Sequence, residues 1–407
     1  MKALIFWLSL TMLLQTTNLM SQQTRIDSSN VASKSVKKPW YESFSIRGYM
    51  QVRYNRLLET NSKLKCEQCD RSWGEGGGIL IRRGRIIISG NLTNNIYFYI
   101  QPDFGSSSGT SLNIFQLRDA YIDIGFDKKN EFRLRVGQSK VPFGFENMQS
   151  SQNRLPLDRN DALNSAVSNE RDLGAFFYWA PEKIRKLFAS FVSENLKGSG
   201  DYGVFAFGVY NGQTANRAEQ NNSLHVVSRI SYPFQIGKQI IEPGLQAYAG
   251  KYVLPADLRT VSVKAANNFE FDDKRMAASF ILYPKPMGIQ AEYNTGKGPK
   301  YNPLKDSIET ADLKGGYITV SYQLNLKNKM VLFPFTRLQQ YDGGKKHELD
   351  ARSYNVKELE TGLEWQINKN FEFTASYVFS ERRFEDSKLK SNLQKGRLLR
   401  LQAQLNF

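Results

Sequence analysis

The chain is poor in the residues on which metal sites and catalytic centres most often depend. Its 407 residues include only two cysteines and two histidines. A zinc site needs about four ligands, and His225 and His347 are far in sequence from Cys66 and Cys69. A serine hydrolase needs a histidine beside its nucleophile, and no such motif surrounds His225. We therefore expect no metal, no cofactor and no enzymatic activity.

Long hydrophobic runs are missing beyond the N-terminus. After residue 21 no stretch approaches the ~18 consecutive apolar residues of a transmembrane helix, which excludes helical spans. The one early run, residues 4–14, follows Lys2 and is too short to span, so residues 1–21 are predicted to be a cleaved signal peptide. A retained anchor helix is the alternative. Residues 22–42 are polar and are expected to be a flexible lead-in.

The C-terminal segment alternates strictly between apolar and polar residues. Leu399, Leu401, Ala403 and Leu405 alternate with polar neighbours, and the chain ends at Phe407. Successive side chains of a strand point to opposite faces, so one face is apolar and the other polar. About ten such residues can cross a bilayer at a tilt. Because only alternate residues face lipid, a mean hydropathy of −0.48 is compatible with a transmembrane β-barrel.

This alternation recurs about sixteen times, and long connections alternate with short ones. An even number of strands with this loop pattern is typical of bacterial outer-membrane barrels. The sequence therefore predicts an all-β fold, a transmembrane antiparallel β-barrel over residues 43–407, with a loop at Gly105 to Gly109. The expected strands are 43–54, 79–91, from 96, 115–126, from 132, 172–180, 201–211, 224–235, 240–251, 274–284, 288–296, 315–326, 330–341, 354–366, 370–381 and 397–407.

One segment has helical rather than strand periodicity. Ile184, Leu187, Phe188 and Phe191 follow helical spacing, with Pro181 before the segment and Gly198 after it. We predict a short amphipathic helix over 182–196 on the periplasmic side. A further strand at 185–194 is the alternative, and it would give an odd count of seventeen.

Several short motifs in the first half of the chain resemble those of one known family. They are Leu117-Arg118-Asp119-Ala120-Tyr121, Arg135 to Gly144, Glu146-Asn147, Glu170-Arg171-Asp172-Leu173-Gly174 and Tyr210-Asn211-Gly212. In combination they resemble the phosphate-selective porin O and P family, over about residue 43 to the C-terminus. The resemblance implies a sixteen-stranded outer-membrane porin, usually a homotrimer. It also implies that the third outer loop folds into the channel and that basic residues there select anions such as phosphate.

Alternation also predicts which charged side chains face the lumen. Selectivity in such barrels comes from pore width and lining charges, and arginine can donate two hydrogen bonds to a phosphate. Carboxylates such as Asp119 and Asp123 could instead pair with these cations and brace the wall, as could Glu358, Glu360, Glu364 and Glu372. The candidate pore-lining cations are Arg47, Arg53, Arg83, Arg85, Arg133, Arg135, Lys140 and Arg400, with Arg229 as an addition.

The connection 142–171 is the candidate constriction, because single long loops in compact domains are usually functional or disordered. Its charges sum to −1, which departs from a basic phosphate-binding loop. The residues are Glu146, Arg154, Asp158, Arg159, Asp161, Glu170 and Arg171. We therefore expect a mild preference for anions rather than phosphate specificity.

The two cysteines form a Cys-x-x-Cys motif in the first long loop. Cys66 and Cys69 are a disulfide candidate, since an exported protein meets an oxidising environment. A catalytic redox pair is the alternative reading of the same motif.

Net charge adds information about partners. The formal charge is +16, and removal of residues 1–21, with Lys2 as their only charge, leaves +15. An exported chain rarely meets nucleic acid, so small anionic solutes, outer-membrane lipid and the phosphates of lipopolysaccharide are the expected partners. The sequence favours passive diffusion of small hydrophilic solutes across the outer membrane. A structural or adhesin barrel is the alternative.

Overall fold

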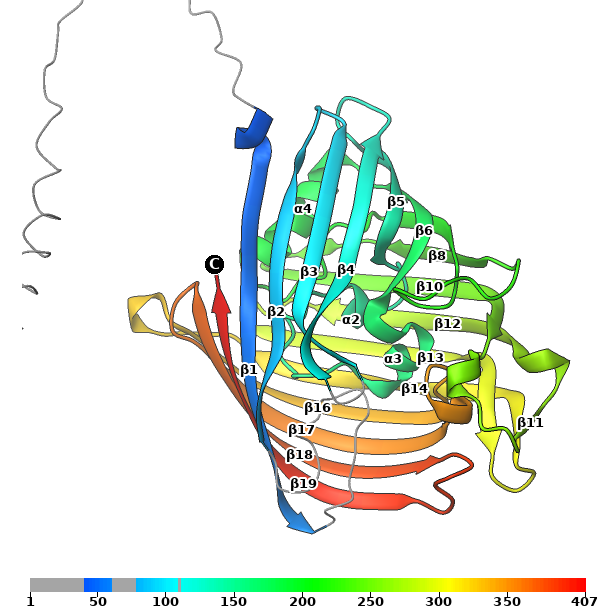
Figure 1. Ribbon diagram of the computed structural model, residues 1–407. Helices are drawn as coiled ribbons and strands as arrows, with labels where there is room; N and C mark the ends of the chain where they lie inside the picture. The colour runs from blue at the N-terminus through cyan, green and yellow to red at the C-terminus, as the bar shows by residue number, and fades with distance from the viewer. Residues whose placement is uncertain (1–39, 61–77, 109–110) are drawn as a thin grey trace, which may run out of the picture. The chain divides into compact units, whose positions relative to one another are not determined.

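Antiparallel strands make up most of the described chain (Figure 1). The computed structural model describes residues 40–60, 78–108 and 111–407, all in the unit Trp40–Phe407. The predicted signal peptide, most of the lead-in, and Cys66 and Cys69 lie outside these residues. The strands are β1 (Phe44–Thr60), β2 (Gly78–Asn91), β3 (Ile96–Ser108), β4 (Ser111–Gly125), β5 (Phe132–Lys140), β6 (Arg171–Trp179), β7 (Phe205–Tyr210), β8 (His225–Ser231), β9 (Phe234–Ile236), β10 (Gln239–Val253), β11 (Lys264–Ala265), β12 (Glu270–Leu282), β13 (Met287–Asn302), β14 (Ser307–Tyr322), β15 (Leu324–Asn325), β16 (Val331–Gly344), β17 (Ser353–Gln366), β18 (Phe371–Glu385) and β19 (Leu393–Asn406).

The described residues also contain helices, most of them short. The α-helices are α2 (Phe145–Met148), α3 (Asp161–Ala166) and α4 (Glu182–Ser193). The 3-10 helices are η1 (Trp40–Ser43), η2 (Ser168–Glu170), η3 (Ala256–Leu258), η4 (Asn267–Phe269), η5 (Lys327–Lys329) and η6 (Leu349–Ala351). In the described part of the chain, no helix has the length and apolar character needed to cross a membrane.

The strands close into a barrel of sixteen staves, where a stave is one strand, or two consecutive strand segments, that fills one position in the barrel wall. Each stave pairs antiparallel with the next along the chain, and β1 pairs with both β2 and β19. Segments β8 and β9 form one interrupted stave against β10, and β14 and β15 form another against β16. The two-residue β11 adds a parallel contact to β14 and is not a stave. The predicted count of sixteen is confirmed.

The polarity of the barrel's two faces is the reverse of that in a soluble protein. Outward side chains are apolar and exposed, such as Ile46 at 72% and Met276 at 67%. Inward side chains are polar and buried, such as Arg53 at 1% and Gln404 at 1%. Exposing apolar rows costs free energy in water, so this arrangement is stable where lipid surrounds the barrel.

The strand ends differ from the prediction on the side of the long loops. The segment Gly105 to Gly109, predicted as a loop, continues β3 through Ser108. There Ser106 pairs with Ile114 and Ser107 with Leu112, across irregular registers. Likewise β13 and β14 extend over much of the segment 297–314, which separates two predicted strands. Polar residues on both faces of these strand extensions obscure the alternation, because the extensions lie beyond the apolar band of the barrel exterior that faces lipid.

Helix α4 confirms the helix predicted over 182–196, and the alternative strand is wrong. Its apolar residues Ile184, Phe188 and Phe191 are buried. Phe191 packs on the buried Tyr283, which directly follows β12, with ring centroids 4.0 Å apart. Ile240, near the start of β10, and Ile281, near the end of β12, belong to the same cluster. Helix α4 therefore packs against these two strand ends.

A hydrophobic core occupies part of the barrel interior. Phe143, Leu163 and Val167, from the connection after β5, pack with Phe176 of β6 and Tyr248 of β10, among others. Phe143 and Tyr248 meet edge to face with ring centroids 4.8 Å apart. This contact holds the connection against one side of the inner wall, so the barrel interior is not filled by water alone.

Candidate functional site

The connection between β5 and β6, residues 141–170, is the inner segment of the site. Sequence reasoning placed a single long loop here and missed α2 and α3, which are too short to give a clear helical period. Asn160 caps α3, since its side chain accepts a hydrogen bond from the Leu163 N–H. Glu292 of β13 accepts hydrogen bonds from the first two N–H groups of α2, on Phe145 at 2.6 Å and Glu146 at 2.9 Å. A carboxylate at a helix N-terminus is stabilising.

Contacts tie the inner segment to strands far from β5 and β6. The Asp161 carboxylate accepts hydrogen bonds from Arg382 of β18 at 2.9 and 3.1 Å, and pairs with Lys345 at 2.5 Å. Its backbone N–H donates to Gln339 of β16 at 3.0 Å. These partners are inward side chains of the far wall, so the inner segment crosses the barrel interior; α2 and α3 are labelled there in Figure 1.

Asp158 anchors the inner segment to β1 and β19. Arg53 donates to both Asp158 carboxylate oxygens at 3.0 and 3.1 Å, and to the Leu157 carbonyl at 2.9 Å. Arg400 pairs with the same carboxylate, and Arg82 reaches it at 3.5 Å. Burial raises the pKa of the Asp158 carboxyl, but Arg53 and Arg400 outweigh it and hold that pKa well below its usual range.

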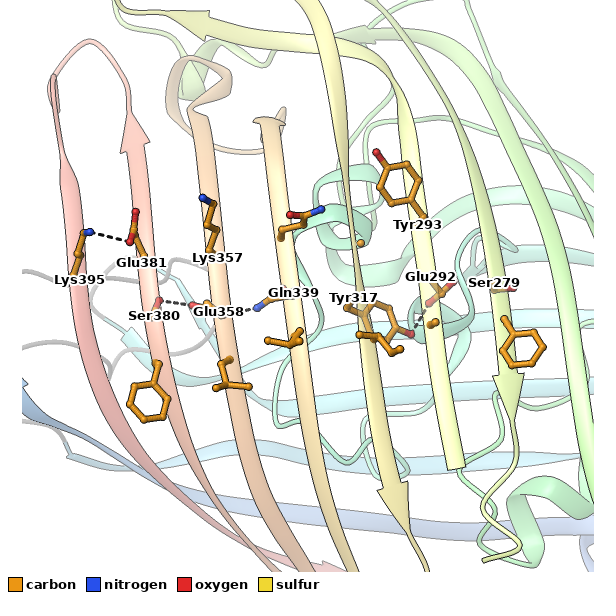
Figure 2. Close-up of a pocket in the computed structure, with 18 of the residues that line it drawn as sticks. Ser279, Glu292, Tyr293, Tyr317, Gln339, Lys357, Glu358, Ser380, Glu381 and Lys395 are labelled. Atoms are coloured by element: carbon orange, nitrogen blue, oxygen red, sulfur yellow. Dashed lines mark hydrogen bonds and ion pairs between the residues drawn. The ribbon is translucent and has the colours of Figure 1, made fainter. Parts of the chain in front are cut away.

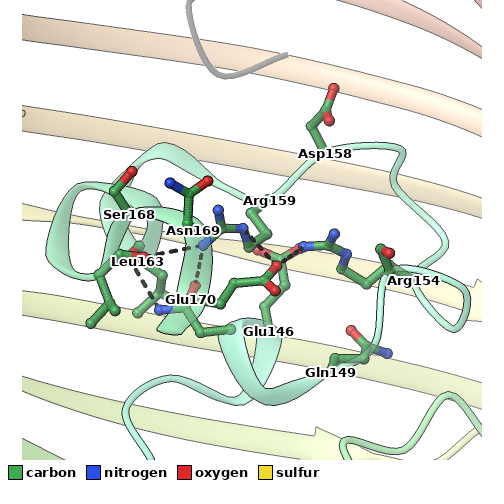
Figure 3. Close-up of polar contacts among 12 residues, drawn as sticks. Glu146, Gln149, Arg154, Asp158, Arg159, Leu163, Ser168, Asn169 and Glu170 are labelled. Carbon is green, nitrogen blue, oxygen red and sulfur yellow. Dashed lines mark hydrogen bonds and ion pairs between the residues drawn. The ribbon is translucent and has the colours of Figure 1, made fainter. Parts of the chain in front are cut away.

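Glu170 is the second carboxylate with several cations around it (Figure 3). Arg159 lies 3.0 Å from it, Arg154 3.3 Å, Lys140 3.7 Å and Arg171 2.5 Å. Burial raises the pKa of the Glu170 carboxyl, yet the surrounding cations, Lys140 foremost, keep that pKa well below its usual range. Four cations around one carboxylate leave a local positive excess.

Arg83 and Arg85, neighbours on the inner face of β2, have different partners. Arg85 donates to the Asp103 carboxylate at 2.7 Å and to the Tyr49 hydroxyl at 2.8 Å. Arg83 donates to the neutral side-chain oxygen of Gln51 at 2.8 Å. Both side chains are buried. Asp103 balances the charge of Arg85, whereas Gln51 leaves the charge of Arg83 in place.

These residues form a basic wall on β1, β2, β3, β4 and β19. The wall also includes the part of the inner segment around Glu170 and the adjoining ends of β5 and β6. Among the described residues of this wall, ten cations stand against four carboxylates: nine pair with a carboxylate, and Arg83 bonds to Gln51. The carboxylates are Asp103, Asp119, Asp158 and Glu170; the cations are Arg53, Arg82, Arg83, Arg85, Arg118, Lys140, Arg154, Arg159, Arg171 and Arg400.

An acidic wall lies on β13, β17 and β18. It consists of five buried inward carboxylates: Glu292, Glu358, Glu360, Glu364 and Glu372. Three of them have a cationic partner: Arg382 lies 2.7 Å from Glu358, Arg337 2.9 Å from Glu360, and Lys197 2.5 Å from Glu364. Two of these cations also pair with inner-segment carboxylates, Arg337 with Glu146 and Arg382 with Asp161.

The remaining predicted cations lie inward, mostly with carboxylate partners. Arg133 pairs with Asp201 at 2.8 Å, Arg135 with Asp123 at 2.7 Å, and Arg229 with Glu242 at 2.9 Å. Arg47 is exposed and stands opposite the buried Ile87 in the β1–β2 ladder, on the inward face. The bracing alternative therefore describes the geometry of Arg133, Arg135 and Arg229.

Sequence reasoning missed several members of the two walls. Arg82 would point outward in a regular strand, but the β1–β2 register shifts between Gln51 and Val52. Such a bulge sets two residues of one strand against one of the other, and Arg82 reaches Asp158. Arg118 lies at a similar register shift in the β3–β4 ladder, so alternation from the inward Asp119 would place it outward. The alternation rule, applied to every strand, could have found the others: Asp103, Glu292, Arg337 and Arg382.

A closed sixteen-stave barrel with a lipid-facing exterior and a charged inner segment defines an outer-membrane porin. The model of the phosphate-selective porin O and P family matches residues 65–407, and the chain belongs to this family. The resemblance noted in the sequence is therefore confirmed. The family is one of channels rather than enzymes. Membership and fold imply the outer membrane as the location.

Solved structures share the fold at low sequence identity. The outer-membrane channel DcaP of Acinetobacter baumannii is 13% identical with a TM-score of 0.52, over 89% of this chain and 97% of DcaP. An anion-selective porin from Comamonas acidovorans is 11% identical with a TM-score of 0.52, over 90% of this chain and 99% of that porin. No curated protein matches the chain.

Proposed function

We propose that this porin lets small hydrophilic solutes diffuse passively across the outer membrane, with a mild preference for anions such as phosphate. The observation that carries the proposal is the unequal charge of the basic wall, where ten cations stand against four carboxylates. Fixed cations lower the energy of an anion nearby and raise that of a cation. The anion-selective porin from Comamonas acidovorans, which has the same fold, is consistent with this direction.

Arg83 is the residue on which we place the strongest anion contact. Its guanidinium is bonded to the neutral Gln51 and lies near the cluster of Arg53, Arg82 and Arg400 around Asp158. One planar guanidinium can donate two hydrogen bonds to two oxygens of a phosphate. Arg47 and Lys140 contribute general positive potential rather than a defined contact.

The inner segment is proposed as the constriction. Its contacts with β1, β16, β18 and β19 hold it across the interior, and its apolar face packs on β6 and β10. The passage then runs beside this segment rather than between it and the basic wall, because Asp158 pairs directly with Arg53 and Arg400. The mixed charge of the segment favours mild selectivity over a dedicated phosphate site.

We also propose how the channel is exported, assembled and oriented. Residues 1–21 are removed on export, and the mature barrel assembles as a homotrimer in outer-membrane lipid and lipopolysaccharide. Helix α4 lies at the end of the short turns, which face the periplasm in barrels of this type.

Planar-bilayer recording of the refolded full-length protein tests the function. We expect discrete conductance steps, partly blocked when phosphate is added at constant ionic strength. Steps without any block would leave a general porin and remove the phosphate contact. A correctly folded barrel that gives no steps would contradict the channel proposal and favour a structural or adhesin role.

A further inference from the structure

The outward face of β12–β19 carries a groove of about 1140 Å³ that the channel function does not use (Figure 2). Small residues hollow it out: Ala278, Ala291 and Gly316 lie among larger outward side chains such as Phe280 and Ile318. The groove is therefore a feature of the exterior wall rather than of the lumen.

Two adjacent rows of cross-strand neighbours line the groove. The lower row runs Phe280, Ala291, Ile318, Leu338, Leu359, Phe379 and ends at Arg397. The upper row runs Ala278, Tyr293, Gly316, Gln340, Lys357, Glu381 and Lys395. The lower row is thus apolar over six staves, whereas the upper row is charged over its last three.

The charged end of the groove is basic. Lys357 and Lys395 stand on either side of the carboxylate Glu381, and Arg397 lies in the adjacent row. Lys395 pairs with Glu381 at 2.9 Å, but both side chains are largely exposed, and exposed pairs contribute little. Lys357 faces Glu381 across the β17–β18 ladder. The two lysines outnumber Glu381, so this end of the groove is positive where the apolar row meets the polar one.

This combination fits an anionic lipid better than a second copy of the chain. Outward residues of β5–β10, such as Phe132, Ile230 and Leu245, are apolar and would offer the lysines no counter-charge. A lipid phosphate would supply that charge, and an acyl chain would cover the apolar row. Lys357 and Lys395 are near the long-loop ends of β17 and β19, which face outward in such barrels.

We propose that the groove binds one lipid A molecule of the outer leaflet. A phosphate lies between Lys357 and Lys395, with Arg397 below it, and an acyl chain lies along Ala291, Ile318 and Leu338. This assignment rests on the proposed outer-membrane function, which sets which end of the barrel faces the outer leaflet.

Native mass spectrometry of the full-length protein in detergent tests the site. The probes are bisphosphorylated lipid A, monophosphorylated lipid A and phosphatidylethanolamine. We expect binding to fall in that order, and K357Q/K395Q to bind bisphosphorylated lipid A about tenfold more weakly, since charge-assisted contacts are the strong ones. The matched control K251Q/K297Q removes two lysines, each of which also has a carboxylate nearby on the strands, and should change binding less than about twofold.

A second variant tests the apolar half without changing charge. Ala291→Phe fills the hollow beside Ile318 and should weaken binding several-fold. Equal binding by K357Q/K395Q and the control, or equal binding of all three lipids by the wild type, would overturn the proposal. Conductance of K357Q/K395Q is recorded in parallel. Absence of channels in every variant would count against the porin function, whereas normal channels with unchanged lipid binding would count against the groove alone.

Discussion

The two charged walls of the barrel interior differ in how their charges are balanced. On the basic wall, ten cations stand against four carboxylates, and single carboxylates such as Asp158 and Glu170 each hold several arginines or lysines. On the acidic wall, five glutamates meet three cations. The comparison shows that the number of inward arginines is a poor guide to selectivity, because partners decide which charge remains.

The inner segment links the two walls. Its Asp158 pairs with the basic wall and its Asp161 with Arg382 beside the acidic wall. Asp158 supplies a counter-charge to the surplus cations of the basic wall, whereas Asp161 binds a cation that Glu358 also holds. The inner segment, with four carboxylates and two arginines, is therefore held on both sides by cations of the walls.

Removing the inner segment should have the largest effect. Deleting 148–165 takes away Asp158 and Asp161 and opens the passage between the walls. We expect single-channel conductance to rise at least about twofold, because conductance increases with pore cross-section. Unchanged conductance would place the segment outside the conducting path. A same-length glycine and serine replacement of 148–165 serves as the control for loss of the barrel itself.

Reversing one charge on the basic wall should have the next largest effect. Arg83→Glu places an anion where Gln51 gives no compensation, and should lower the anion-to-cation permeability ratio roughly threefold or more. Reversal potentials in a salt gradient measure this ratio. The control is Lys297→Glu on β13, an exposed outward position. Equal ratios in both variants would remove Arg83 from the conducting path.

Neutralising a carboxylate on the acidic wall should act in the opposite direction and more weakly. Glu358→Gln leaves Arg382 paired with Asp161, so the barrel should remain folded. We expect the anion-to-cation ratio to rise by roughly 1.5-fold, because Arg382 already offsets part of the glutamate charge. The same gradient measurement applies, and a fall in the ratio would contradict the two-wall description.

Lowering the pH from 7 to 5 should have the smallest effect on the channel of these four changes. The cations around Asp158 and Glu170 hold the pKa of each carboxyl well below its usual range. Such groups stay ionised at pH 5, and the stability from their pairs is lost only as the pH falls through the depressed pKa. We expect conductance to stay constant between pH 7 and 5. A sharp rise near pH 5 would mean that the inner segment had been released.

The sequence predicted the sixteen staves because lipid contact enforces strict alternation on every strand. It named Asp123 as a possible partner for the inward cations, and Asp123 pairs with Arg135. It did not predict partners that come from elements far apart in the chain, as Arg53 of β1 and Asp158 of the inner segment do. The bulge that brings Arg82 inward depends on the pairing register of β1 and β2, which a single strand does not encode. Helices α2 and α3 are held by the wall residue Glu292 and the cap Asn160, so local periodicity was too weak to reveal them.

The most direct test of the central claim is the reversal potential of wild-type channels in a potassium chloride gradient. If the unbalanced cations of the basic wall face the conducting path, chloride carries more current than potassium, and the potential has the sign of an anion-selective pore. A potential of zero, or one of the opposite sign, would contradict the account, because the ten cations would then not control the ions that pass.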